Sequence, residues 1–337
     1  MDQAEALAIL CCPRCGGDLE ASGEKLLCTA CGQGYGVEGN VPRLFWPNEW
    51  DAAKGDVTEV VRAFYEETPF PNYDDFDSVA SLARKAREGR FAQQLDEQVP
   101  PRARILECGC GTGQLSNFLG IANRSVLGSD LSLPSLRLGE AFRAANGLET
   151  VRFLQMNLFR PALRPGRLDL VIANGVLHHT SDPRAAFASI AKLVRPGGFL
   201  LVGLYHRYGR LITDLRRVLF RLSGERFTGL DPNLRDADTS AAKRRAWFRD
   251  QYQHPHESKH TIAETLGWVR EIGFELVRSL PSTRSFAPTG GERLFEREVP
   301  GGWLERALAE LGMAFRGSRE GGFFIVIARR PTGTGAA

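Results

Sequence analysis

The sequence has no long apolar run. Its 337 residues contain no stretch of the roughly 18–20 apolar residues that a membrane-spanning helix needs. The longest runs, such as Phe199 to Tyr205, have the length of a strand. The first residues lack the basic region of a secretory signal, and the apolar stretch Ala6–Leu10 is too short to be its core. We therefore expect a cytoplasmic protein with no membrane partner.

The chain also lacks a strong charge of either sign. Its 43 basic and 40 acidic residues leave a net charge of +3, so we expect no nucleic-acid partner. The hydrophobic share of 43% and the charged share of 25% are ordinary for a globular protein. The length suits one α/β domain of about 200–250 residues with a small appendage. No internal repeat is present, and the sequence leaves the oligomeric state open.

Cysteine is confined to two short segments. Of the seven cysteines, five lie between Cys11 and Cys31, and the other two, Cys108 and Cys110, lie in one Gly-rich stretch. An odd and clustered set argues against a secreted disulfide framework. It favours metal binding in a reducing compartment.

The N-terminal cysteines form two Cys-x-x-Cys pairs, Cys12 with Cys15 and Cys28 with Cys31. Two such pairs around a short hairpin are typical of a tetrahedral structural zinc site. Cys11 is a rival to Cys12, but the two-residue gap before Cys15 favours Cys12. A unit this small needs a metal to fold, so we predict that these four thiolates bind structural Zn²⁺.

Composition and punctuation divide the chain into regions. We predict a zinc ribbon over residues 1–47, a helical connector or lid over 48–101, an α/β domain over 102–330 with a helical cover inserted at 207–260, and a disordered tail over 331–337. The connector carries Tyr65, Phe70 and Tyr73 among prolines. These side chains either close over a ligand and exclude water or form a hydrophobic link.

In the third region, short apolar runs alternate with helical patterns, which is typical of βαβ units and a parallel sheet. The predicted strands are Ala103–Cys108, Ser125–Ser129, Val151–Gln155, Leu168–Ala173, Phe199–Leu204, Phe274–Leu280 and Phe323–Arg329. Asp182 followed by a proline, and Thr261 with Glu264, are helix start signals. We expect Pro196–Gly198 to stop one helix and to lead into the next strand. Helices are also predicted over Thr261–Ile272 and Trp303–Leu311.

A Gly-rich turn follows the first of these strands and precedes a helix that starts at Gln114. Gly109, Gly111 and Gly113 let the backbone approach a ligand closely. The helix N-terminus offers free amides to an anionic group. The pattern alone also fits nicotinamide enzymes of the Rossmann type.

Two acidic residues sharpen this interpretation. Glu107 directly precedes the glycines, where its carboxylate can accept hydrogen bonds from a ligand amino group. Asp130 ends the next strand, at a spacing that suits a contact with a ribose hydroxyl.

Together these features resemble motif I of the class I S-adenosylmethionine-dependent methyltransferases. Three further segments are similar to motifs of the same family, in its order and spacing. Gln155–Leu158 falls where the family has its adenine-contacting residue, Asp169–His179 is similar to the fourth-strand motif of the type 11/12 subgroup, and Leu193–Leu200 is similar to its Leu-(Lys/Arg)-Pro-Gly-Gly turn. The resemblance covers about residues 102–204 and implies a doubly wound, Rossmann-like sheet of seven strands.

The resemblance also implies a binding site for S-adenosylmethionine. The implied contacts come from Glu107, Gly109, Cys110, Gly111, Gly113, Asp130, Leu131, Asn157, Leu158 and Asn174. Asn157 is the implied partner of the adenine amino group. Cys110 replaces a more usual small residue, and we interpret its thiol as packing. The intact glycines and acidic residues argue against a degenerate relative that kept only the fold.

The ribbon, continued by Gly34–Leu44, resembles the zinc-ribbon subunit that activates several RNA and protein methyltransferases. More loosely, it resembles the N-terminal finger of bacterial large-subunit ribosomal RNA guanine methyltransferases. The first resemblance implies a module packed on the catalytic domain, and the second implies a grip on RNA. Few basic side chains lie in the ribbon (Arg14, Lys25 and Arg43), which favours the packing role.

Methyl transfer from a sulfonium is an in-line displacement, in which the protein mainly positions the acceptor and excludes water. A base is needed only when the acceptor must lose a proton. Acceptors in this fold sit beyond the carboxyl ends of the fourth and fifth strands, where Asn174, His178, His179, Tyr205 and His206 fall. His206 is the first choice for a base, with Tyr205 beside it. The alternative is a polar residue without chemistry. We expect the His178–His179 pair to shape the pocket or cap the next helix.

Two other patterns have structural interpretations. His256–His260 matches the His-Glu-x-x-His metalloprotease pattern, but the helix start at Thr261 leaves it outside a helix. The Arg-rich segment after His206 carries an apolar stripe of Leu211, Leu215, Val218, Leu219 and Leu222. Its arginines either recognise phosphate or carboxylate or form the solvated face of a lid helix, and we favour the second.

We therefore predict a methyltransferase that acts on a small-molecule acceptor in an enclosed pocket. The first alternative is an RNA methyltransferase that uses the ribbon to grip RNA. The second is a non-catalytic, methyltransferase-like scaffold. A nicotinamide enzyme comes third, because the fourth-strand and Pro-Gly-Gly motifs disfavour it.

Overall fold

The computed structural model describes residues 8–50, 55–71, 78–224, 226–235, 240–284, 293–316 and 322–333. Tyr73 and residues 334–337 of the predicted tail lie outside this part of the chain. Among the helices described there, none is long and apolar enough to span a bilayer.

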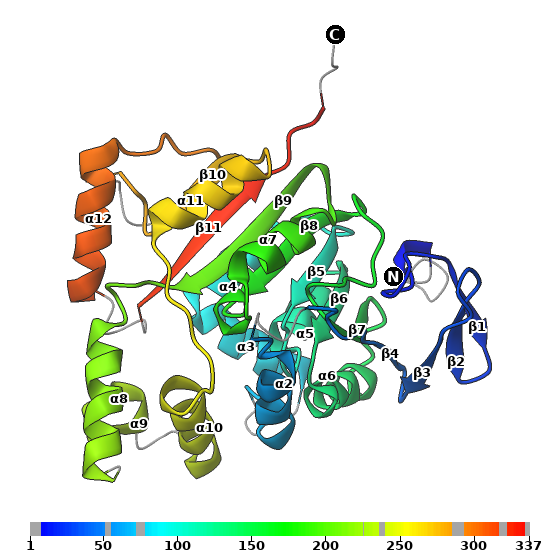
Figure 1. Ribbon diagram of the computed structural model, residues 1–337, viewed down its shortest axis with the longest axis horizontal. Helices are drawn as coiled ribbons and strands as arrows, with labels where there is room; N and C mark the ends of the chain where they lie inside the picture. The colour runs from blue at the N-terminus through cyan, green and yellow to red at the C-terminus, as the bar shows by residue number, and fades with distance from the viewer. Residues whose placement is uncertain are drawn as a thin grey trace.

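The fold is a central sheet with helices on both faces (Figure 1). The ribbon contributes β1 (Leu19–Ser22), β2 (Lys25–Cys28), β3 (Gly34–Glu38) and β4 (Val41–Leu44). The α/β domain contributes β5 (Arg104–Cys108), β6 (Ser125–Asp130), β7 (Val151–Met156), β8 (Leu168–Asn174), β9 (Val194–Tyr205), β10 (Glu275–Leu280) and β11 (Phe323–Arg329). The domain strands lie in the order β7-β6-β5-β8-β9-β11-β10, and only β11 runs antiparallel to its neighbours. The doubly wound α/β class predicted from the sequence is confirmed.

The number of strands in the sheet differs from the expected seven. The described sheet has eleven strands, because the four ribbon strands continue it beyond β7. Strand β4 pairs in parallel with β7, with Arg43 opposite Gln155 and Leu44 opposite Met156. An uncovered edge strand would present unpaired amides and carbonyls. The ribbon therefore completes the sheet edge as well as forming a module of its own.

Helices cover the two faces of the sheet. Their bounds are α2 (Thr58–Glu67), α3 (Val79–Glu88), α4 (Arg90–Gln98), α5 (Gln114–Gly120), α6 (Leu133–Ala145), α7 (Pro183–Ala191), α8 (Leu211–Ser223), α9 (Pro232–Arg235), α10 (Ala241–Tyr252), α11 (Ile262–Glu271) and α12 (Trp303–Arg316), with short 3₁₀ turns at Leu177–His179 and Thr228–Leu230. Buried side chains of α3–α6 form one core with the sheet, and those of α7 and α11 form the other.

The predicted helix start signals are present. The Asp182 carboxylate accepts a hydrogen bond from the Ala185 amide at the start of α7. Thr261 and Glu264 form a reciprocal capping box at the start of α11. The Pro196–Gly198 turn does not precede its strand as expected. It lies inside β9, which begins at Val194, and α7 has already ended at Ala191.

The ribbon packs against the α/β domain. Its buried residues Leu10, Leu26 and Leu44 belong to the same apolar core as Leu154 and Met156 of β7. The Cys11 amide donates to the Ala162 carbonyl at 3.0 Å, so this thiol belongs to the docking segment. This arrangement supports the packing role of the ribbon over the RNA grip.

Candidate active site

A cavity of about 1580 Å³ lies at the carboxyl ends of the parallel strands. Its lining includes almost all residues predicted for the cofactor: Glu107, Gly109, Cys110, Gly111, Asp130, Leu131, Asn157, Leu158 and Asn174. Tyr205 also lines it, whereas Gly113 and His206 do not. Pockets for single ligands hold about 300–1,000 Å³, so this cavity has room for two.

The glycine turn after β5 adopts a backbone that only glycine tolerates well. Gly109, Gly111 and Gly113 have φ values of +62°, +54° and +74°. A Cβ atom at Gly111 would lie 2.1 Å from the Phe70 carbonyl oxygen, and one at Gly113 would lie 2.3 Å from the Phe153 ring. The absence of a side chain at Gly111 thus lets the connector pass close to the turn. The absence of a side chain at Gly113 lets the Phe153 ring pack against it.

Two carboxylates flank this turn, the buried Glu107 and the partly buried Asp130. Asp130 accepts hydrogen bonds from the amides of Gly111 and Ser132, each at 2.8 Å. Glu107 accepts a hydrogen bond from the Ser116 hydroxyl. Burial raises the pKa of Asp130 and raises the pKa of Glu107 to about 7. A cation that enters the cavity would therefore stabilise the ionised form of both carboxylates.

Burial also raises the pKa of Cys110 well above its ordinary value. Its thiol is 5% exposed and stays protonated at neutral pH. This agrees with the packing role expected from the sequence.

The two asparagines of the site differ in their partners. The Asn157 amide donates to the Trp46 carbonyl at 2.9 Å and to Asn48 at 2.8 Å, and its oxygen accepts from the Phe159 amide at 3.0 Å. Its side chain is therefore engaged with the connector, and a contact with adenine stays a prediction. The Oδ1 atom of Asn174 is buried and has no hydrogen-bond partner among the described residues.

The connector crosses the glycine turn. The Thr112 hydroxyl donates to the Pro71 carbonyl, and the Ser132 hydroxyl donates to the Tyr65 carbonyl at 3.2 Å. Tyr65, Phe70 and Pro71 all line the cavity. The segment thus lies where a lid would exclude water from a ligand.

A polar cluster also lines the cavity; sequence reasoning named its Tyr65 and Tyr205 but missed Asp250 and Gln251. The Tyr65 hydroxyl donates to Asp250 at 2.9 Å, and the Gln251 amide donates to Asp250 at 2.9 Å and to the Tyr205 hydroxyl at 2.7 Å. All four side chains line the cavity. Burial raises the pKa of Asp250. We call this group the acceptor cluster.

An ion pair supports the acceptor cluster from behind. The fully buried Arg210 donates to Glu257 at 2.8 Å and to the Gln251 side-chain oxygen at 2.6 Å. Its guanidinium carbon lies 3.8 Å from the centre of the Tyr205 ring. Burial raises the pKa of Glu257, but Arg210 and Arg217 outweigh this and hold it below its usual value. No local motif marks these residues, because four separate segments supply them.

His179 is the histidine that reaches the cavity. Its Nδ1 atom lies 3.0 Å from the His256 carbonyl oxygen. A carbonyl can only accept, so Nδ1 carries the proton and Nε2 keeps a free lone pair. Burial lowers the pKa of His179 to about 4, so the ring is neutral at pH 7. The neighbouring ring of His254 stacks 3.7 Å from it, centre to centre.

The other predicted histidines lie away from the cavity lining. His206 is completely buried, its Nε2 atom bonds to Glu310, and its Nδ1 atom accepts from the Gly209 amide at 3.2 Å. This placement favours a structural role over that of a base. His178 is also completely buried, and neither ring nitrogen has a partner among the described residues. His256–His260 lies outside any helix, as expected.

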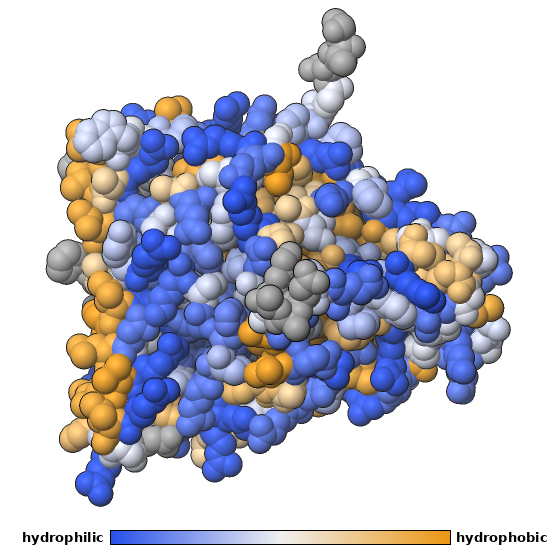
Figure 2. All heavy atoms as spheres, viewed as in Figure 1, coloured by the Kyte–Doolittle hydropathy of each residue, from blue (hydrophilic) through white to orange (hydrophobic). Residues whose placement is uncertain are grey.

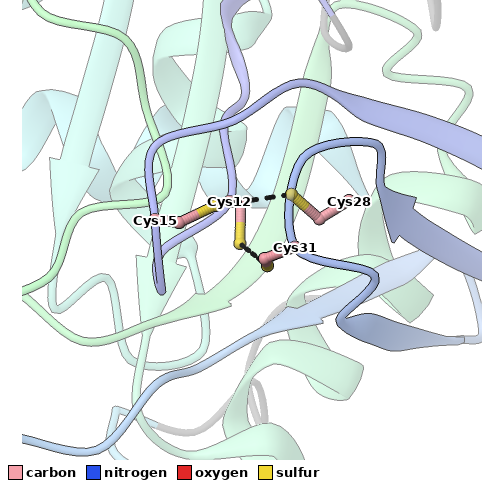
Figure 3. A group of neighbouring side chains, drawn as sticks. All are labelled: Cys12, Cys15, Cys28 and Cys31. Carbon is pink, nitrogen blue, oxygen red and sulfur yellow. Dashed lines mark hydrogen bonds between the residues drawn. The ribbon is translucent and has the colours of Figure 1, made fainter.

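The four predicted zinc ligands converge at the ribbon (Figure 3). The Sγ atoms of Cys12, Cys15, Cys28 and Cys31 all lie within 4.8 Å of one another, with Cys12–Cys31 at 3.8 Å and Cys15–Cys28 at 3.5 Å. Four sulfurs at about 2.3 Å from a tetrahedral metal would lie about 3.8 Å apart. The donor set and its size therefore fit zinc.

Both knuckles share one backbone pattern. The amides of Gly16 and Gly32 donate to the carbonyls of Cys12 and Cys28, at 2.7 and 3.0 Å. A Cβ atom at Gly17 would lie 3.1 Å from the Cys28 sulfur, so glycine leaves room for the thiolates.

Comparison with known proteins agrees with this geometry. A family model described as a methyltransferase domain matches residues 106–202. An uncharacterized protein of Synechococcus sp. is 29% identical over 255 residues, covering 66% of this chain and 60% of that protein. The ubiquinone biosynthesis O-methyltransferase of Ralstonia nicotianae is 33% identical over 105 residues, covering 31% of this chain and 44% of that protein.

Among solved structures, the complex of the Haloferax volcanii Trm112 methyltransferase activator with a methyltransferase is 15% identical, with a TM-score of 0.48, and covers 82% of this chain and 99% of that one. The chain spans less than two thirds of the length of the two curated relatives named above. The family model and the site geometry nevertheless agree over the same strands. Residues 106–202 are therefore a methyltransferase domain of the S-adenosylmethionine-dependent class.

Proposed function

We propose that the protein transfers the methyl group of S-adenosylmethionine to a small molecule held in the same cavity. The observation that carries this proposal is one cavity with two different walls. One wall has the glycine turn and the carboxylates of Glu107 and Asp130, and the other has the acceptor cluster and His179. The packed ribbon gives no support to the RNA alternative.

The glycine wall fits the cofactor. Glu107 can accept a hydrogen bond from its amino group, Asp130 can accept from the ribose hydroxyls, and Asn174 offers a buried oxygen that has no partner among the described residues. When bound, the cofactor supplies an activated methyl group on a sulfonium. The protein holds the reactants in line and keeps water out through Tyr65 and Phe70.

The apolar part of the cavity lining favours an acceptor with an apolar body. It includes Leu82, Phe91, Leu115, Leu280 and Phe323. Such walls bury apolar surface and leave few polar groups to fix orientation. A single hydroxyl on the acceptor would then be oriented by the acceptor cluster.

His179 takes the role first assigned to His206. Its free Nε2 atom accepts the proton that an acceptor hydroxyl loses as the methyl group arrives. Asp250, which lies on the same wall, orients the hydroxyl together with Tyr65.

The four cysteines would hold Zn²⁺ in a structural role. All four tetrahedral positions are filled by protein ligands, which leaves no open site for substrate. The metal would stabilise the ribbon on the edge of the sheet.

Isothermal titration of the zinc-loaded protein with S-adenosylmethionine tests the first step. We expect micromolar binding, weakened about 100-fold by Asp130→Ala because a charged hydrogen-bond acceptor is lost. Asp214→Ala is the matched control, since this carboxylate pairs with Lys259 away from the cavity. A folded wild-type protein that does not bind would favour the scaffold alternative.

A further inference from the structure

Two helices at one end of the molecule present an apolar face outward. Eight of their side chains are each more than half exposed: Leu211, Leu215, Val218 and Leu222 of α8, and Trp303, Leu304, Leu308 and Leu311 of α12. The two helices lie one above the other along the left edge in Figure 1, and Figure 2 shows apolar side chains along the same edge. We call these residues the α8–α12 face.

The α8–α12 face is larger than an ordinary surface patch. Its eight side chains expose on the order of 1,000 Å², whereas the largest apolar patch on a typical monomer is about 300–600 Å². The apolar stripe of α8, read from the sequence, faces out because the opposite side of the helix is held inward by polar contacts. Arg217 donates to Glu257 at 3.0 Å and to the Gln251 carbonyl at 2.7 Å.

The exposed charges beside the α8 half of this face are basic, whereas Glu305 of α12 is partly exposed. Among the exposed positions on the described parts of α8 and α12, Arg221 is the one charged residue. Arg226 follows α8 and is exposed as well. Neither arginine has an ion-pair partner among the described residues. An apolar helix face bordered by arginine is the pattern of a helix that lies in the surface of an anionic bilayer.

The cavity lies directly behind one of the two helices. Met313, on the inward side of α12, lines the cavity, while Leu308 and Leu311 on the same helix are exposed. An apolar cavity and an apolar outer face thus share one helix. A lipid bilayer would complement both the apolar cavity and the apolar outer face, whereas a second copy of the protein would cover only the outer face.

We propose that the α8–α12 face docks on an anionic lipid bilayer, in the plane of its headgroups. The docking involves no membrane-spanning helix among the described residues. The inference does not depend on methyl transfer, because docking uses residues outside the cofactor site.

Vesicle flotation with the full-length, zinc-loaded protein tests this proposal. We expect binding to vesicles that contain phosphatidylglycerol and much weaker binding to pure phosphatidylcholine. The Leu215→Glu/Leu308→Glu variant should lose at least tenfold in partitioning for each buried leucine. The Arg221→Gln/Arg226→Gln variant should lose roughly fivefold for each arginine, on anionic vesicles only.

Leu138→Glu is the matched control, because Leu138 on α6 is 43% exposed and lies outside the α8–α12 face. It should leave flotation unchanged, and S-adenosylmethionine titration should show that each variant is folded. Wild-type protein that fails to float with either vesicle overturns the proposal, as does binding that the leucine variant retains. A dimer in light scattering that Leu215→Glu/Leu308→Glu dissociates would assign the face to a second copy and also overturn it.

Discussion

The cofactor wall of the cavity lies at the ends of successive strands within residues 107–174, whereas the acceptor wall joins side chains as far apart in the sequence as Tyr65 and Gln251. On the first wall, burial raises the pKa of an acid, Glu107, to about 7. On the second, burial lowers the pKa of a base, His179, to about 4. Both shifts favour the neutral form, but they put the titration of the two walls about three pH units apart. Measurements that separate binding from turnover can therefore address each wall by itself.

The largest expected effect is on the acceptor wall. His179→Gln removes the free Nε2 lone pair, so the turnover number should fall by about 100-fold, the low end of the usual contribution of a general base, because a pKa of about 4 makes this imidazole a weak base. Cofactor affinity should stay within about twofold, because His179 makes no contact with the glycine turn. Single-turnover rates and titration calorimetry on the same preparation separate the two. A variant with normal turnover would remove His179 from the mechanism.

The next effect is on stability in acid. His179 has a folded pKa of about 4, below its ordinary value of 6.5, so its contribution is present above pH 6.5 and is lost as pH falls toward 4. Between pH 7.5 and 5 this histidine alone should cost about 2 kcal/mol of unfolding free energy. Urea titrations at both pH values measure the loss. His179→Gln should flatten the pH dependence by that amount, and an unchanged slope would contradict the buried, neutral imidazole.

A smaller effect is expected on the cofactor wall. Protonated Glu107 cannot attract a cation, so S-adenosylmethionine should bind about tenfold more tightly at pH 8 than at pH 6. Glu107→Gln serves as the control, because it removes the titrating carboxylate and leaves the titration of the cofactor's own groups unchanged. Equal pH dependence in both proteins would show that Glu107 does not face the amino group.

The smallest effect concerns the hydroxyl beside Glu107. Ser116→Ala removes the hydrogen bond that favours the ionised carboxylate, so the pKa of Glu107 should rise further. Affinity at pH 7 should fall by about threefold, because losing a hydrogen bond of roughly 1 kcal/mol leaves about a third as much of the carboxylate ionised. Titration calorimetry from pH 6 to 8 would reveal the shifted midpoint. A simple loss at every pH would instead indicate that Ser116 only packs.

These walls also differ in how far the sequence predicted them. The glycine turn, Asp130 and the paired cysteines could be predicted because a short motif or a characteristic spacing marks each of them. Strand positions followed from apolar runs, and helix starts followed from capping residues such as Thr261.

The acceptor cluster could not be predicted in this way. Asp250 and Gln251 sit in a polar helix with no distinctive spacing, and only the fold brings them to Tyr65 and Tyr205. His206 had the expected place at the end of its strand, but burial beside Glu310 turned it away from the cavity. The sequence pattern predicts that His206 lies at a strand end, but it does not predict which neighbouring residue its side chain will contact.

Because β4 pairs in parallel with β7, the oxidation state of the four ribbon cysteines should affect the long-term solubility of the protein. Cysteines oxidised beyond the thiolate no longer bind metal, and a ribbon without metal has little to hold it folded. Once β4 detaches, β7 becomes a bare edge that can template strands of other chains. Oxidative damage would then appear first as aggregation, before any loss of the catalytic groups themselves.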